Sequence, residues 1–331
     1  MCSFLCVVCA RLNEGVNTRT QKIFKWGHLF VSLLQRHWYS LARLKRLSKN
    51  TMVLYQRLGR FDEHLVNFYS VAFGDPYIYE DTYLLYYDRF SKILYLSLFE
   101  LNGCEDKLQC IETAKRLFKP EKIVITSPER LQRELGDFHC VNINFDRDYQ
   151  IYLPKFNENL EGNAYKHLRY RVHNAVKRGY YLEIGRKMTP AHCHLIACHE
   201  VEKKCDLWDS QLYLSIREYL KHFMSPLLLN AFSNKMLIGF DLVDFLNDTM
   251  TIPFGFYLDY PSLADFILFK EIVYAKEKGY TWLDLGWACN SGVESFKRKW
   301  MAEPRFEIWT QEYVKNKVEK NWHLALNSSN S

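Results

Sequence analysis

The residues with the clearest chemical character lie close together near the end of the chain, in residues 283–304. An apolar run that carries Asp284 ends at Gly286, and a polar loop with Gly292 follows it. A short segment with helical spacing then carries three adjacent cations: Lys297, Arg298 and Lys299. Ligands of open α/β sheets bind beyond the carboxyl ends of strands, and clustered cations can hold a phosphate or a carboxylate. This segment therefore predicts a binding site for an anionic ligand.

Three side chains are candidates to orient or deprotonate an amine nucleophile, namely Tyr257, Asp259 and Asp284. Tyr257 and Asp259 lie where an apolar run gives way to a turn, and Asp284 lies near the end of the next apolar run. Each also has a structural explanation: Asp259 as a turn residue, Asp284 as a loop anchor and Tyr257 as a packed strand aromatic. Both interpretations stay open at the level of the sequence.

The elements that must position these residues occur in an order that the chain repeats. In the first half, two strands with hairpin spacing, a helix and a strand are predicted at residues 82–87, 93–99, 105–118 and 122–126. In the second half, the same order is predicted at residues 235–245, 249–258, 265–278 and 280–285. The repetition indicates two similar α/β domains, with a boundary near residues 148–159.

Two helices are predicted between the repeated segments. The first, at residues 162–178, is strongly basic and carries Arg169, Arg171 and Lys177. Like charges on one helix face cost stability unless a ligand uses them, so this helix could bind the phosphates of a nucleotide, a coenzyme or RNA. The alternative is a helix face that is simply solvated. The second helix, at residues 189–204, begins with the N-cap pattern of Thr followed by Pro.

The second helix also carries a group of histidines and cysteines that invites a metal interpretation. His194 and Cys198 are four residues apart and could chelate an ion. A structural zinc site, however, needs turns between its ligand pairs, whereas this group lies along one helix, so we expect no metal site. The ten cysteines of the chain show no regular framework, which favours reduced thiols in a cytoplasmic protein.

The composition of the chain excludes some broad classes of protein. The 331 residues are 48% hydrophobic and 16% aromatic, which excludes a largely disordered chain. The net charge of +6 favours anionic ligands without selecting among them. No run approaches the ~20 apolar residues of a membrane span. Residues 22–47 have the spacing of a basic amphipathic helix, which could lie on a membrane surface or pack on its own domain.

The segment that carries the cations resembles the C-terminal signature of GNAT-like and FemAB-like N-acyltransferases, a group that includes the C-terminal domains of phosphatidylglycerol lysyltransferases. The matching pieces are Ala-Lys-Glu-Lys-Gly-Tyr at 275–280, Asp-Leu-Gly at 284–286, Gly-Val at 292–293 and Phe-Lys-Arg-Lys-Trp at 296–300. The family usually has glycine where this chain has Met301. The basic helix at 162–178 resembles a helix that these proteins carry before the catalytic domain.

The resemblance implies an α/β (α+β) fold of tandem GNAT-like domains, each a mixed, mostly antiparallel sheet flanked by helices. Residues 52–147 would form a degenerate first domain and residues 148–315 the catalytic domain. Residues 1–51 would be an N-terminal basic amphipathic extension, and residues 316–331 a C-terminal tail.

The resemblance also implies a reaction, in which an amine attacks the carbonyl of an activated acyl donor. Such folds hold the donor in the gap between two splayed strands and its phosphates at the start of the following helix, here residues 258–265. Lys297, Arg298 and Lys299 would neutralise a phosphate or carboxylate. The donor would be acyl-CoA or aminoacyl-tRNA, used as a co-substrate with no tightly bound cofactor. The chain lacks the usual glycine-rich phosphate loop, which favours aminoacyl-tRNA and makes tRNA a candidate partner.

Two alternative functions fit the same sequence. The first is a non-enzymatic GNAT-fold module that binds a phosphate-bearing ligand or RNA. The second is a lipid aminoacyltransferase at the membrane surface, which would give the amphipathic segment at 22–47 a purpose.

Overall fold

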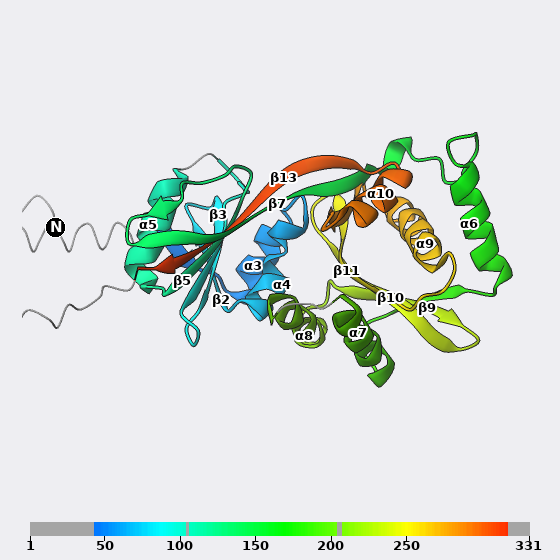
Figure 1. The fold of residues 1–331 in the computed structure, drawn as a ribbon, viewed down its shortest axis with the longest axis horizontal. Helices are drawn as coiled ribbons and strands as arrows, with labels where there is room; N and C mark the ends of the chain where they lie inside the picture. Colours follow the sequence, from blue (N-terminus) through cyan, green and yellow to red (C-terminus); the bar gives the residue numbers. More distant parts are fainter. Residues whose placement is uncertain (1–42, 104–105, 204–206, 317–331) are drawn as a thin grey trace, which may run out of the picture. The chain divides into compact units, whose positions relative to one another are not determined.

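The computed structural model describes residues 43–103, 106–203 and 207–316 (Figure 1). The described residues from 46 onward belong to one compact unit, which contains both repeated segments. The amphipathic helix predicted at residues 22–47 lies mostly outside the described residues, and that part stays a prediction. Its described end is not helical, because Leu44–Arg46 form the strand β1. The same holds for the C-terminal tail that we expected at residues 316–331.

The first half of the described chain contains a curved sheet with helices on both sides. Its elements are β1 (Leu44–Arg46), α3 (Lys49–Gln56), the 3₁₀ helix η1 (Asp62–His64), α4 (Val66–Ala72), β2 (Asp75–Tyr79), β3 (Tyr83–Asp88), β4 (Ile93–Ser97), α5 (Lys107–Phe118), β5 (Lys122–Ser127), β6 (Glu134–Leu135) and β7 (Phe138–Tyr152).

The second half repeats the pattern with additional helices before it. Its elements are the 3₁₀ helix η2 (Leu153–Lys155), α6 (Lys166–Lys177), β8 (Tyr181–Gly185), α7 (Pro190–Lys203), α8 (Leu207–His222), β9 (Leu227–Ser233), β10 (Met236–Phe245), β11 (Thr249–Tyr257), α9 (Leu263–Glu277), β12 (Trp282–Trp287), α10 (Ser291–Lys299) and β13 (Glu303–Lys315).

The predicted repeat is present in the structure. In the first half, β3 and β4 form an antiparallel hairpin, and β5 lies parallel to β4 after the crossover helix α5. In the second half, β10 and β11 form the hairpin, and β12 lies parallel to β11 after α9. The predicted strand and helix boundaries agree with the observed ones to within a few residues, because hydrophobic spacing and turn residues mark these elements strongly.

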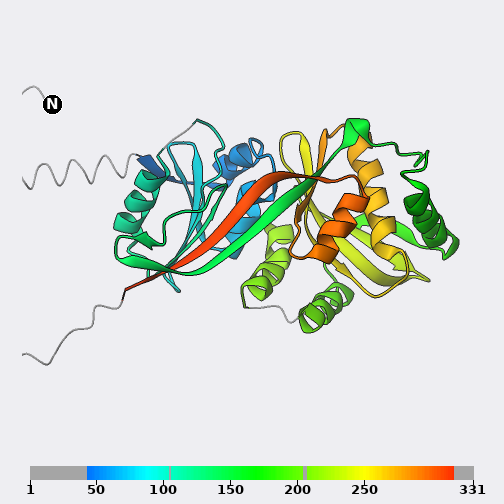
Figure 2. The ribbon, with the colours of Figure 1, turned by 45° about the horizontal axis from the view of Figure 1, so that its top comes forward.

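Two long strands join the halves into one sheet. From β2 onward its order is β2-β3-β4-β5-β13-β7-β12-β11-β10-β9-β8. β13 pairs with β5 of the first half and runs antiparallel to β7 along almost its whole length, so that the two strands lie side by side across both halves (Figures 1 and 2). The domain boundary that we expected near residues 148–159 therefore begins inside a continuous strand.

The sheet of the second half is covered by helices on its two faces (Figure 1). Alternate residues of β9 and β10 point to opposite faces. Leu228 and Leu242 pack with α7 and α8, whereas Leu229 and Val243 pack with α9. A strand buried on both faces reads as a mostly apolar run, which is the pattern of β10 apart from the buried Asp241 and Asp244. Within the described part of the chain, no helix combines the length and the apolar character that crossing a membrane requires.

Candidate functional site

The strands β11 and β12 separate after a short stretch of pairing. They pair in parallel at three positions, from Thr249 opposite Trp282 to Thr251 opposite Asp284. β11 then continues to Tyr257 along β10, whereas Trp287 of β12 pairs with Asp148 of β7. In the first half, by contrast, every residue of β4 pairs with β5. The described sheet therefore opens between β11 and β12 but stays closed at the equivalent place in the first half.

Asp284 lies at the point where the two strands separate. Its side chain is fully buried and accepts hydrogen bonds from the backbone N–H groups of Asp62 (2.8 Å) and Gly286 (2.8 Å) and from the hydroxyl of Thr251 (3.1 Å). The bond to Asp62 reaches 222 residues back along the chain and fixes η1 of the first half at the start of the opening. Asp284 thus anchors three segments at once.

Two further carboxyl groups lie against that of Asp284. One oxygen from each of Asp62, Asp148 and Asp284 lies within 4.8 Å of the others, and all three residues are buried. Burial and the charge of Asp284 raise the pKa of both Asp62 and Asp148 well above the usual range. Gln150 donates to Asp148 Oδ1 (3.1 Å) and accepts a bond from the guanidinium of Arg305 (2.6 Å). We call Asp62, Asp148 and Asp284 the carboxylate cluster.

Lys297 is buried beside the carboxylate cluster, with only 5% of its surface exposed. Its ammonium group donates to the carbonyl oxygens of Leu285 (2.6 Å), Gly286 (2.7 Å) and Trp287. These carbonyls belong to the last three residues of β12, so Lys297 connects α10 to the end of that strand. Burial lowers the pKa of Lys297, while the negative charge of Asp148 opposes this effect.

Lys299 lies at the first turn of α9. Its ammonium group forms an ion pair with Asp265 Oδ1 (2.5 Å), which also accepts a hydrogen bond from the indole of Trp300 (2.9 Å). Lys299 and the C-cap residue Trp300, both at the end of α10, therefore compensate the negative charge of Asp265. No side chain caps the first amides of α9, where Ser262 is the N-cap residue. This arrangement leaves a helix N-terminus without side-chain capping next to a partly exposed cation, a combination that suits an anion.

The end of the basic helix α6 also lies beside the start of α9. Ala175 and Tyr180 pack with Leu263 and Phe266 of α9. Lys177, in the last turn of α6, is exposed near this contact. Arg171, six residues earlier in the same helix, is also exposed. Arg169 instead donates to the carbonyl of Leu160. The structure therefore brings one end of the predicted basic helix to the start of α9.

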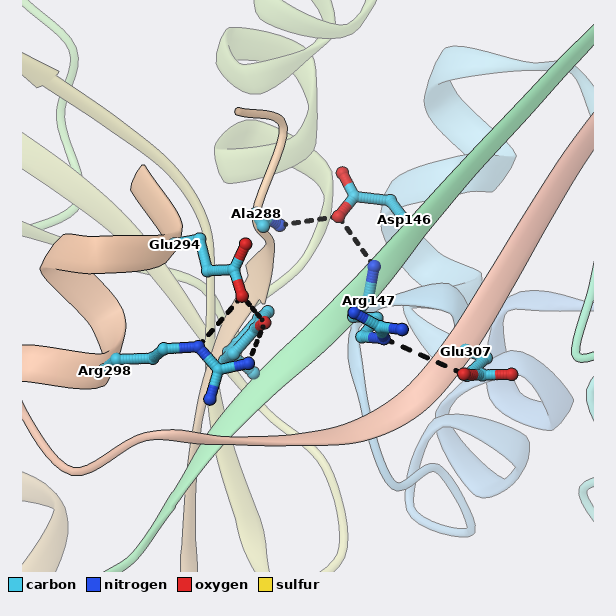
Figure 3. Close-up of polar contacts among 7 residues, drawn as sticks. Asp146, Arg147, Ala288, Glu294, Arg298 and Glu307 are labelled. Atoms are coloured by element: carbon cyan, nitrogen blue, oxygen red, sulfur yellow. Dashed lines mark hydrogen bonds and ion pairs between the residues drawn. The ribbon is translucent and has the colours of Figure 1, made fainter. Parts of the chain in front are cut away.

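Arg298 lies beside Glu294, one turn earlier in α10 (Figure 3). Its guanidinium donates to Glu294 (2.8 Å) and to the hydroxyl of Tyr149 (3.0 Å), and Tyr149 in turn donates to Glu294 (2.6 Å). Gly292 lies in the first turn of the same helix, where its N–H donates to the capping side chain of Asn290 (3.0 Å). These contacts hold α10 against β7, apart from the cluster that Lys297 adjoins.

Tyr257 and Asp259 occupy different environments from Asp284. Tyr257 is 38% exposed, but its hydroxyl donates to the buried carboxylate of Asp241, and burial raises the Tyr257 pKa. Burial also raises the pKa of Asp241 to about 6, and Asp241 lies in contact with the buried Glu271 of α9. Asp259 is exposed in the turn between β11 and α9.

Several polar groups of this region have little signal in the sequence. The buried Asp62, Asp148 and Gln150 and the exposed Arg305 were not among our candidates, because they come from three segments far apart in the chain. One signal was available: Asp62 belongs to an Asp-Glu-His triplet enclosed by apolar residues at 61 and 65–66. A charged triplet within an apolar stretch indicates ionisable groups that the fold buries for a purpose or pairs with one another.

The sequence matches no protein-family model and no curated protein sequence. Solved structures, however, are similar over most of the chain. They include the C-terminal domain assigned to a lysylphosphatidylglycerol synthetase of Agrobacterium fabrum (TM-score 0.53, 11% identity, covering 81% of this chain and 92% of that chain). L-PGS from Bacillus licheniformis gives a TM-score of 0.50 at 13% identity, covering 83% and 93%.

A tandem GNAT protein from the clavulanic acid biosynthesis pathway is similar to the same extent, with a TM-score of 0.51 at 13% identity, covering 83% of this chain and 98% of that chain. Identity this low establishes the fold and leaves the substrates open. The repeated hairpin-helix-strand units, the opening between β11 and β12 and these similarities together show that the chain has the tandem GNAT fold of GNAT-like acyltransferases and lysylphosphatidylglycerol synthetase domains.

Proposed function

We propose that this protein is an N-acyltransferase that moves an acyl or aminoacyl group from an activated donor to an amine. The donor would lie along the opening between β11 and β12, with its phosphates at the start of α9. The observation that carries this proposal is the position of Lys299, which lies at the N-terminal turn of the helix that follows the splayed strands. The equivalent strands of the first half leave no opening, so the second half would hold the donor.

Several groups near the opening suit the chemistry of acyl transfer. From Ile252 to Tyr257, β11 has no strand partner on its β12 side among the described residues, so backbone amides there could stabilise an oxyanion. Asp259 is the exposed carboxylate at the wide end of the opening and would orient the amine or accept its proton. Asp284, with three hydrogen bonds to its oxygens, would position the strands rather than move a proton.

The donor would be acyl-CoA or aminoacyl-tRNA. The basic end of α6 beside α9 extends the positive region beyond a single phosphate, which supports a polyanionic donor. A thermal-shift series with acetyl-CoA, a long-chain acyl-CoA and aminoacyl-tRNA would select the class, because a ligand that binds only the folded state raises the Tm. The donor that stabilises the protein would then be tested for transfer to amines, including lysyl-tRNA with phosphatidylglycerol vesicles as the lipid alternative.

The variant Lys299→Gln tests the assignment of the phosphate site. Removing one charge-assisted contact should weaken donor binding about tenfold. Lys278→Gln, which removes an exposed lysine at the opposite end of α9, is the matched control and should bind as the wild type does. Equal donor affinity in the wild type and both variants would remove the start of α9 as the phosphate site.

The position of η1 favours a second function, that of a GNAT-fold module that binds a phosphate-bearing ligand or RNA without catalysis. Residues of η1 occupy the narrow end of the opening, where Asp62 lies 3.4 Å from the position that a Cβ on Gly286 would take. A hollow of about 230 Å³, lined by Arg60, His64 and Glu100 among others, adjoins η1. Stabilisation by a donor without acyl transfer to any amine would support this function over the enzymatic one.

A further inference from the structure

The carboxylate cluster contains oxygen atoms that the described protein leaves without hydrogen bonds. Asp62 and Asp148 are 8% and 0% exposed. Within the described part of the chain, neither Asp62 Oδ1 nor Asp148 Oδ2 has a hydrogen-bond partner. A buried carboxylate oxygen without a partner is costly, because burial removes its hydration and nothing replaces it. These two atoms therefore point to a group that compensates them.

The cations near the carboxylate cluster do not fill this role directly. The ammonium of Lys297 is directed to three backbone carbonyls. Arg305 reaches the cluster only through the side chain of Gln150. In the ionised form that binds a metal, three carboxylates against the single buried charge of Lys297 would leave two negative charges in a buried region. A divalent cation would balance this charge.

The geometry also fits an ion with oxygen ligands. Hard divalent cations bind carboxylate oxygens at about 2.0–2.6 Å, so two oxygens on opposite sides of one ion lie about 4–5 Å apart. The three aspartates each offer one oxygen, and these oxygens lie within 4.8 Å of one another. The set contains no histidine or cysteine, which disfavours zinc and favours Mg²⁺, Mn²⁺ or Ca²⁺.

We propose that Asp62, Asp148 and Asp284 together bind one divalent cation of the Mg²⁺, Mn²⁺ or Ca²⁺ class. The ion joins η1 of the first half to β7 and β12, and thus fixes the narrow end of the opening between β11 and β12. It is a structural cross-link and takes no part in the acyl-transfer chemistry proposed above. The sequence directed attention to the histidines and cysteines of α7 instead, because the three aspartates come from segments 86 and 136 residues apart.

The experiment uses the full chain without any acyl donor, so that its outcome is independent of the proposed enzymatic function. The metal content of the purified protein is measured, the protein is stripped with a chelator, and Tm is followed during titration with MgCl₂, MnCl₂, CaCl₂ or ZnCl₂. We expect a Tm rise of roughly 5 °C at saturation with one of the first three salts. A similar rise with NaCl at matched ionic strength would assign the effect to screening and overturn the proposal.

Asp148→Asn is the informative variant, because an amide keeps the shape of the site and its oxygen can still accept the hydrogen bond from Gln150. The variant should lose the cation-induced Tm rise, and in chelator it should be at least as stable as the wild type, because the amide is neutral at every pH and needs no compensating cation or proton. Asp244→Asn, which alters a buried carboxyl outside the cluster, is the control and should keep the rise. Absence of bound metal together with an unchanged Tm in all four salts would show that the carboxyl groups carry protons instead.

Discussion

Met301 occupies the position after α10 where the resembling family usually has glycine, and the turn still forms. It is the residue after the C-cap of α10, and its φ of 63° lies in the left-handed region. Its N–H donates to the carbonyl of Arg298 (3.0 Å), and the N–H of Ala302 donates to that of Lys297 (3.1 Å). This is a Schellman motif, in which glycine is the preferred residue. The turn forms with methionine, so the family-like ending of α10 is kept at a cost in backbone strain.

Replacement of Met301 by glycine should therefore stabilise the protein by roughly 1 kcal/mol. The side chain is 41% exposed, so little packing is lost with it. The midpoint and slope of urea unfolding would measure the change.

The matched control is the reverse substitution at the end of α9. Gly279 has a φ of 81° in the same kind of turn, and a Cβ there would meet no atom within 4 Å. Gly279→Met should thus destabilise the protein by roughly 1 kcal/mol through the backbone alone. Equal stabilities of both variants and the wild type would contradict the assignment of strain to Met301.

At the scale of elements, one buried carboxyl links two helices to the sheet. Asp244 of β10 is fully buried and accepts hydrogen bonds from Gln56 of α3 (2.9 Å) and from Tyr219 of α8. It also accepts a bond from the backbone N–H of Phe245 (2.7 Å). Burial raises the pKa of Asp244 from 3.8 to about 7, although the hydrogen bonds from Phe245 and Gln56 oppose the shift. The contact between α3 and β10 crosses from one half of the chain to the other.

This raised pKa predicts a pH dependence of stability. Between about pH 4 and pH 7 the folded protein binds more protons at Asp244 than the unfolded chain does, so the contribution to the free energy of unfolding decreases as the pH rises. Below the pKa that Asp244 has in the unfolded chain, its contribution to the free energy of unfolding is roughly 4 kcal/mol. This contribution is lost as the pH rises through about 7. Urea unfolding of the wild type and of Asp244→Asn at several pH values would measure it.

The free energy of unfolding of the wild type should fall relative to that of Asp244→Asn between pH 4 and pH 8. Asp248→Asn, which changes an exposed carboxylate in the turn between β10 and β11, should keep the slope of the wild type. A slope that is the same in the wild type and in Asp244→Asn would exclude Asp244 as its source.

At the scale of the whole molecule, the two halves depend on each other through β7 and β13. β13 pairs through Trp309 to Val314 with β5, and through most of its length with β7. A cut between residues 147 and 148 would divide β7 and leave most of the β13 pairs without a partner, because only the pairs with Asp148, Tyr149 and Gln150 would remain. Unpaired buried backbone groups are costly, so neither half retains a complete sheet by itself.

We therefore expect the intact chain to unfold in one cooperative transition, and a fragment of residues 148–315 to lack fixed tertiary structure. Near-ultraviolet circular dichroism of the fragment and calorimetry of the intact chain would test this expectation. Two separate calorimetric transitions, or a fragment with native-like near-ultraviolet signals, would show that the halves are independent domains.

The sequence alone determined the local elements and their order. The hairpins, the crossover helices α5 and α9 and the strands β5 and β12 were predictable, because their spacing, caps and turn residues act within a few positions of one another. The positions of the cations in α10 were also predictable from the segment around Phe296. The long pairing of β7 with β13 was not predicted, because strand partners so distant in the chain leave no local signal.

Only the tertiary structure decided which predicted residues share a site. It separated Lys297, which binds the carbonyls at the end of β12, from Lys299, which lies at the start of α9. It also brought Asp62 and Asp148 to Asp284 and left Tyr257 with Asp241. Burial and the approach of distant charges set the chemistry of a carboxyl group. Both depend on the packing of segments that the chain itself keeps far apart, and so they follow from the fold rather than from local sequence.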